Sequence, residues 1–497
     1  MKILRAYLVE LAAKRTDVVL SAQLFEKVLN LKMAVRPNSA GAFASRLHDF
    51  DTLRNFVTSS TILTLIDLPF VIIFLIFIFY LGGWLAAVPV IIFPLAIYQG
   101  LRAQKKLRPT IENVMRGSAK KNATLIESLV GIDTIKTLGA EGQVQRVWEQ
   151  SVGYVSQWSL QSRLISNRAL QSVQFFQQFA MVAIVVIGVY LIGDQQLTLG
   201  GLIACVILNG RALAPIGQIA NLLVSYDHAE GTLKSLNEVM ALPVERDAEQ
   251  RYLHRPVLDG NIQLKQVTFS YPEQPRPALE NINLNIKAGE RVAIIGRIGS
   301  GKSTIARLII RLYDPDNGSV LVDGFDAKQL DPADLRSNMG YVAQDAKLYF
   351  GTVRDNITFG LQSVSDADVV EAARQAGLLE LINSHPLGFE MPVGERGENL
   401  SGGQRAAIAM ARVFLRKPRV LLMDEPTAAM DQGTEERLCQ QIKTAFADNT
   451  LILITHKMNM LDLVDRLIVL DRAMIVADGP KEAVLQALKD GKIRGKG

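Results

Sequence analysis

The chain has 497 residues, which is too long for one ordinary domain, and 49% of the residues are hydrophobic. The formal net charge is only +5, and the lysines and arginines flank apolar runs, which disfavours a nucleic-acid-binding protein. The two cysteines, Cys205 and Cys439, lack the sequence partners of a metal site and argue against a disulfide framework.

The first 60 residues are mixed and charged, with leucines recurring at helical spacing. Leu4, Leu8 and Leu11 show this pattern, and Pro37 and Gly41 interrupt it later. Because charged residues break every apolar window in this region, we expect a solvated helical hairpin rather than a membrane span.

Four apolar runs follow, each near the roughly 20 residues that a helix needs to cross a bilayer. Tight turns at Gly82 and Gly193 join the runs into two hairpins, and Pro89 and Pro94 predict kinks in the second run. The expected spans are residues 62–81, 84–101, 175–192 and 197–213.

The charges around these runs predict their orientation. Both short turns lack Lys and Arg, whereas the long loops are rich in them, so the positive-inside rule places the long loops and both termini in the cytoplasm. Asp67, near the start of the first run, could be a proton or substrate site. An interfacial cap is favoured, because charges are rare at the bilayer midplane.

The remainder of the chain has ordinary globular composition. We expect a transmembrane domain over residues 1–240, a linker over 241–259 and a soluble domain over 260–497. Residues 262–271 alternate like a half-buried strand, while the apolar runs 420–423 and 451–455 are typical of buried parallel strands. The soluble domain is therefore predicted to be α/β with a parallel core sheet.

A phosphate-binding loop stands between an apolar strand pattern and a helix pattern, which is the context that its motif requires. Its glycines allow backbone N–H groups to point at phosphate oxygens. Lys302 is expected to face the outer phosphates, and the hydroxyl of Ser303 is positioned for Mg²⁺. The nucleotide-binding residues of this loop are Gly296, Gly299, Ser300, Gly301, Lys302, Ser303 and Thr304.

Two carboxylates, Asp424 and Glu425, end the apolar run that begins at Val420. Asp424 is a candidate Mg²⁺ ligand, and Glu425 is a candidate for polarising a water toward the γ-phosphate. An acidic pair that merely closes a strand is the alternative, which the upstream phosphate loop makes less favoured.

A second anion-binding pattern, Leu400-Ser401-Gly402-Gly403-Gln404, stands at the start of a predicted helix. It resembles the signature motif of ABC transporter ATPases. The resemblance implies that Ser401, Gly402, Gly403 and Gln404 contact the γ-phosphate of ATP held by the opposite subunit of a homodimer. It covers residues 260–479.

Other positions match that family and take their expected roles from it. Tyr271 resembles the aromatic residue that stacks on adenine, and Gln344 resembles the glutamine that senses Mg²⁺ and couples to the membrane domain. Asp431 lies in a loop that crosses the dimer interface, with Met430 where leucine is usual. His456 matches the switch histidine near the γ-phosphate.

The membrane half resembles that of exporters with a fused ATPase domain, most closely bacterial type I secretion ATPases. The resemblance implies an inner-membrane homodimer that uses ATP and Mg²⁺ to export an unfolded polypeptide, with a periplasmic adaptor and an outer-membrane channel as partners. A lipid, drug or peptide exporter, or a membrane-bound ATPase that transports nothing, remains an alternative.

The implied fold class is the helical transmembrane domain of ABC exporters joined to an α/β P-loop ATPase domain. Exporters of this family have six spans, and four are visible here. We therefore expect that one helical hairpin, and the peptidase-like domain that many type I secretion ATPases carry, would precede Met1 in a complete exporter.

Overall fold

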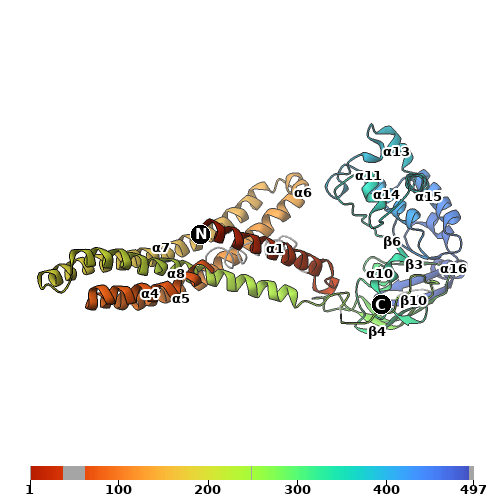
Figure 1. Cartoon of the computed structure of the whole chain (residues 1–497). Helices are drawn as coiled ribbons and strands as arrows, with labels where there is room; N and C mark the ends of the chain where they lie inside the picture. Colours follow the sequence, from red (N-terminus) through yellow and green to blue (C-terminus); the bar gives the residue numbers. More distant parts are fainter. Residues whose placement is uncertain (1, 37–61, 248, 492–497) are drawn as a thin grey trace. The chain divides into compact units, whose positions relative to one another are not determined.

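The computed structural model describes residues 2–36, 62–247 and 249–491 (Figure 1). The chain separates into two compact units by its internal contacts, and each is described by itself. The first comprises Met1–Leu31 and Arg36–Pro243, and the second comprises Lys32–Val35 and Val244–Gly497.

The first unit is built from helices. α5 packs along α7, and α8 contacts α4, α5 and α7. Figure 1 shows α4, α5, α7 and α8 running side by side as long rods. The helices are α1 (Lys2–Leu29), α4 (Ile62–Gly82), α5 (Ala87–Val130), α6 (Ile132–Thr137), α7 (Glu141–Gly193) and α8 (Leu199–Met240). The helical prediction for the start of the chain is confirmed by α1, whereas the interruption at 37–41 lies outside the described residues.

Both predicted hairpin turns are present. A short 3₁₀ helix, η3 (Gly83–Ala86), joins α4 to α5, and Gly83 has a left-handed φ of 53°. The second turn follows α7, and the hydroxyl of Thr198 caps α8 by accepting from the N–H of Gly201 at 3.1 Å. α5 continues as one helix through Pro94 and Pro109.

Apolar side chains from successive helices pack together inside this unit. One cluster includes Ile78, Leu85, Ile184 and Cys205, and a second includes Ile92, Ala96, Val173, Ala180 and Leu213. Many other large apolar side chains are exposed, as expected for helices that have lipid or another protein as their surroundings.

Among the described residues, two helical stretches are long and apolar enough to cross a membrane, Pro69–Val130 and Glu141–Gly193. The first stretch takes in most of α4 and all of α5, and therefore contains the later part of the expected run 62–81 and all of the run 84–101. The last expected span corresponds to a shorter apolar helix, Leu199–Ala214. By length and composition, the helices therefore match the four expected spans only in part.

The second unit contains two sheets. A six-stranded sheet has the order β10-β9-β3-β8-β7-β6, and its strands β9, β3, β8, β7 and β6 are parallel neighbours. The four-stranded sheet has the order β2-β1-β4-β5 and is antiparallel. The strands are β1 (Ile262–Phe269), β2 (Leu279–Ile286), β3 (Arg291–Gly296), β4 (Asn317–Val322), β5 (Phe325–Asp326), β6 (Met339–Val342), β7 (Val420–Asp424), β8 (Thr450–Ile454), β9 (Arg466–Asp471) and β10 (Met474–Pro480).

The six-stranded sheet confirms the predicted parallel core. β7 and β8 are buried at every position, which explains their unbroken apolar sequence. Parallel strands bring their carboxyl ends to one edge, so the loops after β3, β6, β7 and β8 meet there. This edge is where phosphate-binding and acidic residues were expected from the sequence.

Helices cover the sheets and form two buried clusters. One cluster joins the parallel sheet to α14 (Gly402–Arg416) and α12 (Asp366–Gln375), and the other lies around β1, β3 and α9 (Lys302–Ile309). The remaining helices are α10 (Pro332–Ser337), α11 (Val353–Thr358), α13 (Leu379–Ser384), α15 (Gln432–Ala445) and α16 (Lys481–Lys489).

A short segment from early in the chain belongs to the second unit. It is Lys32–Val35, and it includes the 3₁₀ helix η1 (Met33–Val35). The ammonium of Lys32 lies 2.8 Å from a carboxylate oxygen of Asp314. Burial alone would raise the pKa of Asp314, but its hydrogen bond to Lys32 and the charges of Lys32 and Arg311 hold that pKa below its ordinary value.

Candidate active site

The loop between β3 and α9 has a backbone that only glycine tolerates at its ends. Gly296 and Gly301 have φ values of 153° and 102°. A Cβ atom at Gly296 would lie 2.0 Å from the carbonyl oxygen of Leu470, and one at Gly301 would lie 2.4 Å from that of Ala278. The glycines therefore permit both the left-handed turn and the close packing against neighbouring backbone.

Lys302, at the start of α9, points back into this loop. Its ammonium donates to the carbonyl oxygens of Gly296 at 2.7 Å and Arg297 at 2.8 Å, and the residue is 7% exposed. Burial lowers the pKa of Lys302, while the charges of Glu425 and Asp424 oppose the shift. The loop thus holds a buried cation beside two carboxylates.

A cavity of about 740 Å³ lies over the outer side of the loop. Tyr271 and Arg307 line it together with Gly299, Gly301, Lys302, Ser303 and Thr304. The hydroxyl of Tyr271 is 3.1 Å from that of Thr304 and accepts from Arg307 at 3.1 Å. The cavity therefore joins a ring and a cation to the phosphate-binding loop.

Asp424 is the last residue of β7 and is 4% exposed. Burial raises its pKa, its hydrogen bond with Ser303 opposes that shift, and the neighbouring charge of Glu425 adds to it. A buried carboxylate beside a hydroxyl supplies the oxygen ligands that Mg²⁺ prefers. The residues present therefore fit the metal that the sequence indicated.

Glu425 joins groups from three strand ends. One of its carboxylate oxygens lies 3.2 Å from Nε2 of His456, and the other accepts from the amide of Gln344 at 3.4 Å. These residues follow β7, β8 and β6 in turn. Glu425 itself has a left-handed φ of 46°, which separates its direction from that of the adjacent Asp424.

Ser401 caps the amino end of α14. Its hydroxyl accepts from the N–H of Gln404 at 3.2 Å, and the side chain of Gln404 accepts from the N–H of Ser401 at 2.8 Å. This reciprocal capping box gives Gln404 a structural partner that was not anticipated from the sequence. Among the described residues, no hydrogen bond or ion pair joins Ser401–Gln404 to the phosphate-binding loop, and these residues do not line its cavity.

Asp431 is also a helix cap. Its carboxylate accepts from the N–H of Thr434 at 2.9 Å and from its hydroxyl at 2.7 Å, and these bonds lower the pKa of Asp431. The preceding loop packs on the start of α14, where a Cβ atom at Gly402 would lie 2.9 Å from Cβ of Ala429. Ser401 and Asp431 thus cap the first turns of α14 and α15, which lie next to each other on one surface.

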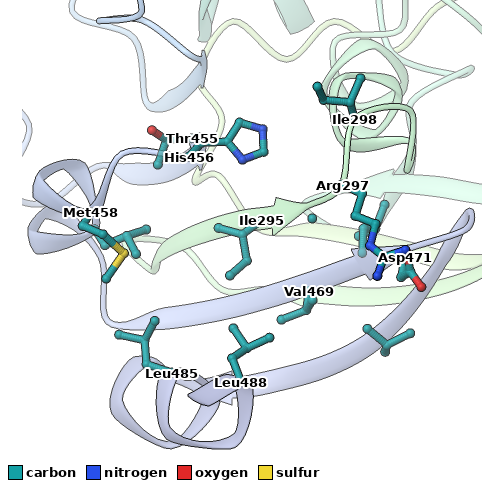
Figure 2. A pocket seen from close by; sticks show the side chains of 14 residues that line it. Ile295, Arg297, Ile298, Thr455, His456, Met458, Val469, Asp471, Leu485 and Leu488 are labelled. Atoms are coloured by element: carbon teal, nitrogen blue, oxygen red, sulfur yellow. The ribbon is translucent and has the colours of Figure 1, made fainter. Parts of the chain in front are cut away.

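A larger cavity of about 1030 Å³ adjoins the phosphate loop on another side (Figure 2). Figure 2 shows Leu485 and Leu488 of α16 below Val469 of β9, with His456 on the upper side of the cavity and Arg297 at the right. Its lower wall is apolar, and neither Lys302 nor Ser303 lines it, whereas both line the smaller cavity. The smaller cavity is therefore the better candidate for binding phosphates.

The site contains one group that the sequence prediction missed. Arg307 bonds Tyr271 and also hydrogen-bonds Tyr341, the residue before the end of β6. Arg307 stands four residues after Ser303 on α9, a spacing that places both side chains on the same face of the helix. This signal becomes meaningful only once Tyr271 and Tyr341 are known to lie nearby.

Comparison with known proteins agrees with both halves of this architecture. Residues 279–428 match the ABC transporter family, and residues 1–212 match the ABC transporter transmembrane region. The alpha-hemolysin translocation ATP-binding protein HlyB of Escherichia coli O157:H7 is 32% identical over 97% of this chain and 68% of the relative. The chain belongs to the ABC transporter family. It is an exporter with fused transmembrane and ATPase regions, and it is an ATPase that binds ATP.

Further similarities support the same assignment. The leukotoxin translocation ATP-binding protein LktB of Mannheimia glucosida is 34% identical over 97% of this exporter and 68% of that relative. The structure of a bacterial Atm1-family ABC exporter with ATP bound aligns with a TM-score of 0.88 at 24% identity, covering 100% of this chain and 88% of the other. The latter likeness shows the shared fold.

Proposed function

We propose that this exporter energises a type I protein secretion system in a bacterial inner membrane, moving an unfolded polypeptide out of the cytoplasm. The observation that carries the proposal is the similarity to toxin translocation proteins, which extends through both units rather than the ATPase region alone. A periplasmic adaptor and an outer-membrane channel complete the proposed route.

The proposed nucleotide site uses residues at the sheet edge. Lys302 holds the outer phosphates, and the adenine ring stacks against Tyr271. Ser303, Asp424 and Gln344 would hold Mg²⁺, which supplies charge neutralisation at the phosphates when bound. The support is the shared cavity of Tyr271 and Lys302, and the bond between Ser303 and buried Asp424.

Glu425 is proposed to position the attacking water. Its carboxylate lies within hydrogen-bond reach of both Gln344 and His456, so these side chains hold it in one direction. His456 then donates toward the γ-phosphate as charge develops there. General-base contributions of this kind are worth about 10²–10⁴-fold in rate.

The homodimer is proposed because one chain carries two anion-binding helix starts that do not meet. Ser401, Gly402, Gly403 and Gln404 would complete the ATP site of a second copy, with Asp431 beside them. The support is the separation of these residues from the cavity that contains Lys302. Closure around ATP then draws the two ATPase domains together, and hydrolysis releases them.

The test is to measure ATP turnover and secretion together in cells that supply candidate adaptor and channel proteins. Lys302→Ala should lose ATP binding, because the buried cation is removed. Glu425→Gln should bind ATP and slow hydrolysis by about 10²-fold or more. Both should abolish polypeptide export, whereas the exposed control Lys287→Ala should retain it.

Three outcomes separate the alternatives. Normal turnover in Glu425→Gln contradicts the role of that carboxylate. ATP turnover stimulated by a lipid or drug, with no exported polypeptide, replaces the secretion proposal with another cargo. Turnover that remains unlinked to any export contradicts transport itself.

A further inference from the structure

The helices α5 and α7 carry a belt of exposed cations at one level. We define this cationic belt as Arg102, Lys105 and Lys106 of α5 with Arg163 and Arg168 of α7, all of which are exposed. None of the five forms an ion pair with any residue that the structure describes; Arg163 donates to the carbonyl oxygen of Ser159. Within the described part of the chain, the belt therefore carries positive charge that no carboxylate pairs.

Two contacts show that the residues of the belt lie at matching heights. The hydroxyl of Tyr154 on α7 donates to Asn113 on α5 at 3.1 Å, and Ala96 packs in one cluster with Val173. The belt lies between these two contacts on both antiparallel helices. At 1.5 Å per residue, Arg102 is about 16 Å along α5 from Asn113, and Arg163 to Arg168 are about 14–21 Å along α7 from Tyr154.

On each helix the cations continue an exposed apolar stripe. Ile91, Leu95 and Tyr98 precede Arg102 and Lys105 at intervals of three and four residues, which places them on one face of α5. Phe175 and Phe179 continue the face of Arg168 on α7 in the same way. Each face therefore changes from apolar to cationic as it leaves the expected span.

The two helices carry no carboxylate of their own beside the belt. The sequence has no Asp or Glu from 68 to 111 or from 150 to 193. Glu112 and Glu230 lie 3.9 Å and 3.6 Å from Arg108, which is outside the belt. A ligand that satisfies both parts of this surface needs an apolar body and an anionic head.

We propose that the cationic belt binds the headgroups of anionic phospholipids, whose acyl chains cover the apolar stripes of α5 and α7. The occupant follows from charge complementarity, because an anionic headgroup at the cytoplasmic interface meets unpaired cations while its chains lie against exposed Ile, Leu and Phe. A zwitterionic lipid offers the same chains without the net charge.

The test is native mass spectrometry of the full chain in nanodiscs containing equal amounts of phosphatidylglycerol and phosphatidylcholine. The wild-type chain should retain phosphatidylglycerol preferentially. Replacing all five belt residues by Gln should reduce this preference by about tenfold or more, given the energy of each cation near an anionic surface. The control, Lys120→Gln with Arg146→Gln, removes exposed cations farther along the same helices and should leave it unchanged.

A second variant guards against a folding defect. Arg102→Lys, Arg163→Lys and Arg168→Lys together conserve the charge and should keep the preference. An unchanged preference in the five-Gln chain overturns the proposal, as does displacement of the lipid by inorganic phosphate. Disulfide crosslinking between copies through Lys105→Cys, with Cys205 and Cys439 replaced by Ala, would instead assign the belt to a subunit interface.

Discussion

Adjacent carboxylates at the end of β7 have opposite surroundings. Asp424 completes a buried strand and bonds Ser303, whereas Glu425 turns through a left-handed φ toward His456. Because the backbone turns at Glu425, the two carboxylates point in different directions, as the proposed division between holding Mg²⁺ and positioning water requires. A left-handed glutamate costs about 1–2 kcal/mol, which the surrounding strands offset.

Asp424→Asn should stabilise the ATPase domain in the absence of Mg²⁺ while abolishing Mg²⁺-dependent hydrolysis. Burial raises the pKa of Asp424, so its carboxylate destabilises the folded state at neutral pH. Because asparagine carries no charge, its advantage should be largest near pH 7 and vanish as the pH falls below the ordinary value of 3.8. Calorimetry of the full chain measures the difference in Tm between the variant and the wild type. Each kcal/mol added to the free energy of unfolding should raise Tm by about 2–4 °C.

The exposed carboxylate variant Asp462→Asn is the matched control and should leave the melting temperature nearly unchanged. If Asp424→Asn has a lower melting temperature than the wild type at pH 7 without metal, then the buried charge of Asp424 does not destabilise the fold, and the prediction is wrong.

Individual residues show where sequence reasoning succeeds and where it stops. Asp424, Glu425 and His456 could be picked out because each stands at or just beyond the end of a strongly apolar run. The bond from Arg307 to Tyr271 could not, since it joins residues whose proximity depends on how a helix packs against a separate sheet. The roles of the predicted site residues remain predictions that the experiments above test.

At the scale of elements, two positions of the phosphate loop require glycine for different physical reasons. Gly299 has a φ of 80° but nothing lies within 4 Å of the position of its Cβ, whereas Gly301 meets the backbone of Ala278. At Gly299 only the left-handed backbone disfavours other residues. At Gly301 a side chain would also collide with the backbone of Ala278.

Gly301→Ala should therefore damage ATP binding more than Gly299→Ala. The strain of a left-handed alanine costs about 1–2 kcal/mol at either site, and Gly301→Ala must also displace backbone. Titration with a fluorescent ATP analogue, together with thermal unfolding of the full chain, measures both effects. Equal losses in the two variants would show that the contact with Ala278 relaxes without cost.

Elements were predictable where periodicity was strong. The parallel strands and both hairpin turns are confirmed, because unbroken apolar runs and glycine turns have few other structural solutions. The four-stranded antiparallel sheet was foreseen only at β1, since its pairing with β4 depends on contacts between distant segments. The capping box at Ser401 carried a readable Ser-x-x-Gln signal that the prediction did not use.

On the scale of the whole molecule, the proposed function requires two copies, because each ATPase domain supplies half of two composite sites. Mixing Lys302→Ala chains with Ser401→Arg chains tests this requirement. Each variant alone should be inactive, whereas mixed dimers contain one intact site and one doubly damaged site. ATP hydrolysis should therefore return on mixing purified chains in one membrane.

Lys287→Ala mixed with Ser401→Arg is the control for loss of activity during mixing, because the phosphate loop of the Lys287→Ala chain is intact. Crosslinking that shows a strictly monomeric, fully active ATPase contradicts the composite site. So does a mixture of the two damaged chains that stays inactive although exchange is demonstrated.

The segment Lys32–Val35 has a consequence for how the protein is made. Lys32 and its partner Asp314 are separated by 282 positions in the chain. At about 5–20 residues per second, the ribosome needs roughly 15–55 s to add the residues between them. Lys32 therefore emerges long before its carboxylate exists, and every helix from α4 to α8 is synthesised during the wait. Joining this segment to the ATPase domain is consequently a late event in biogenesis, set by translation rather than by the speed of local folding.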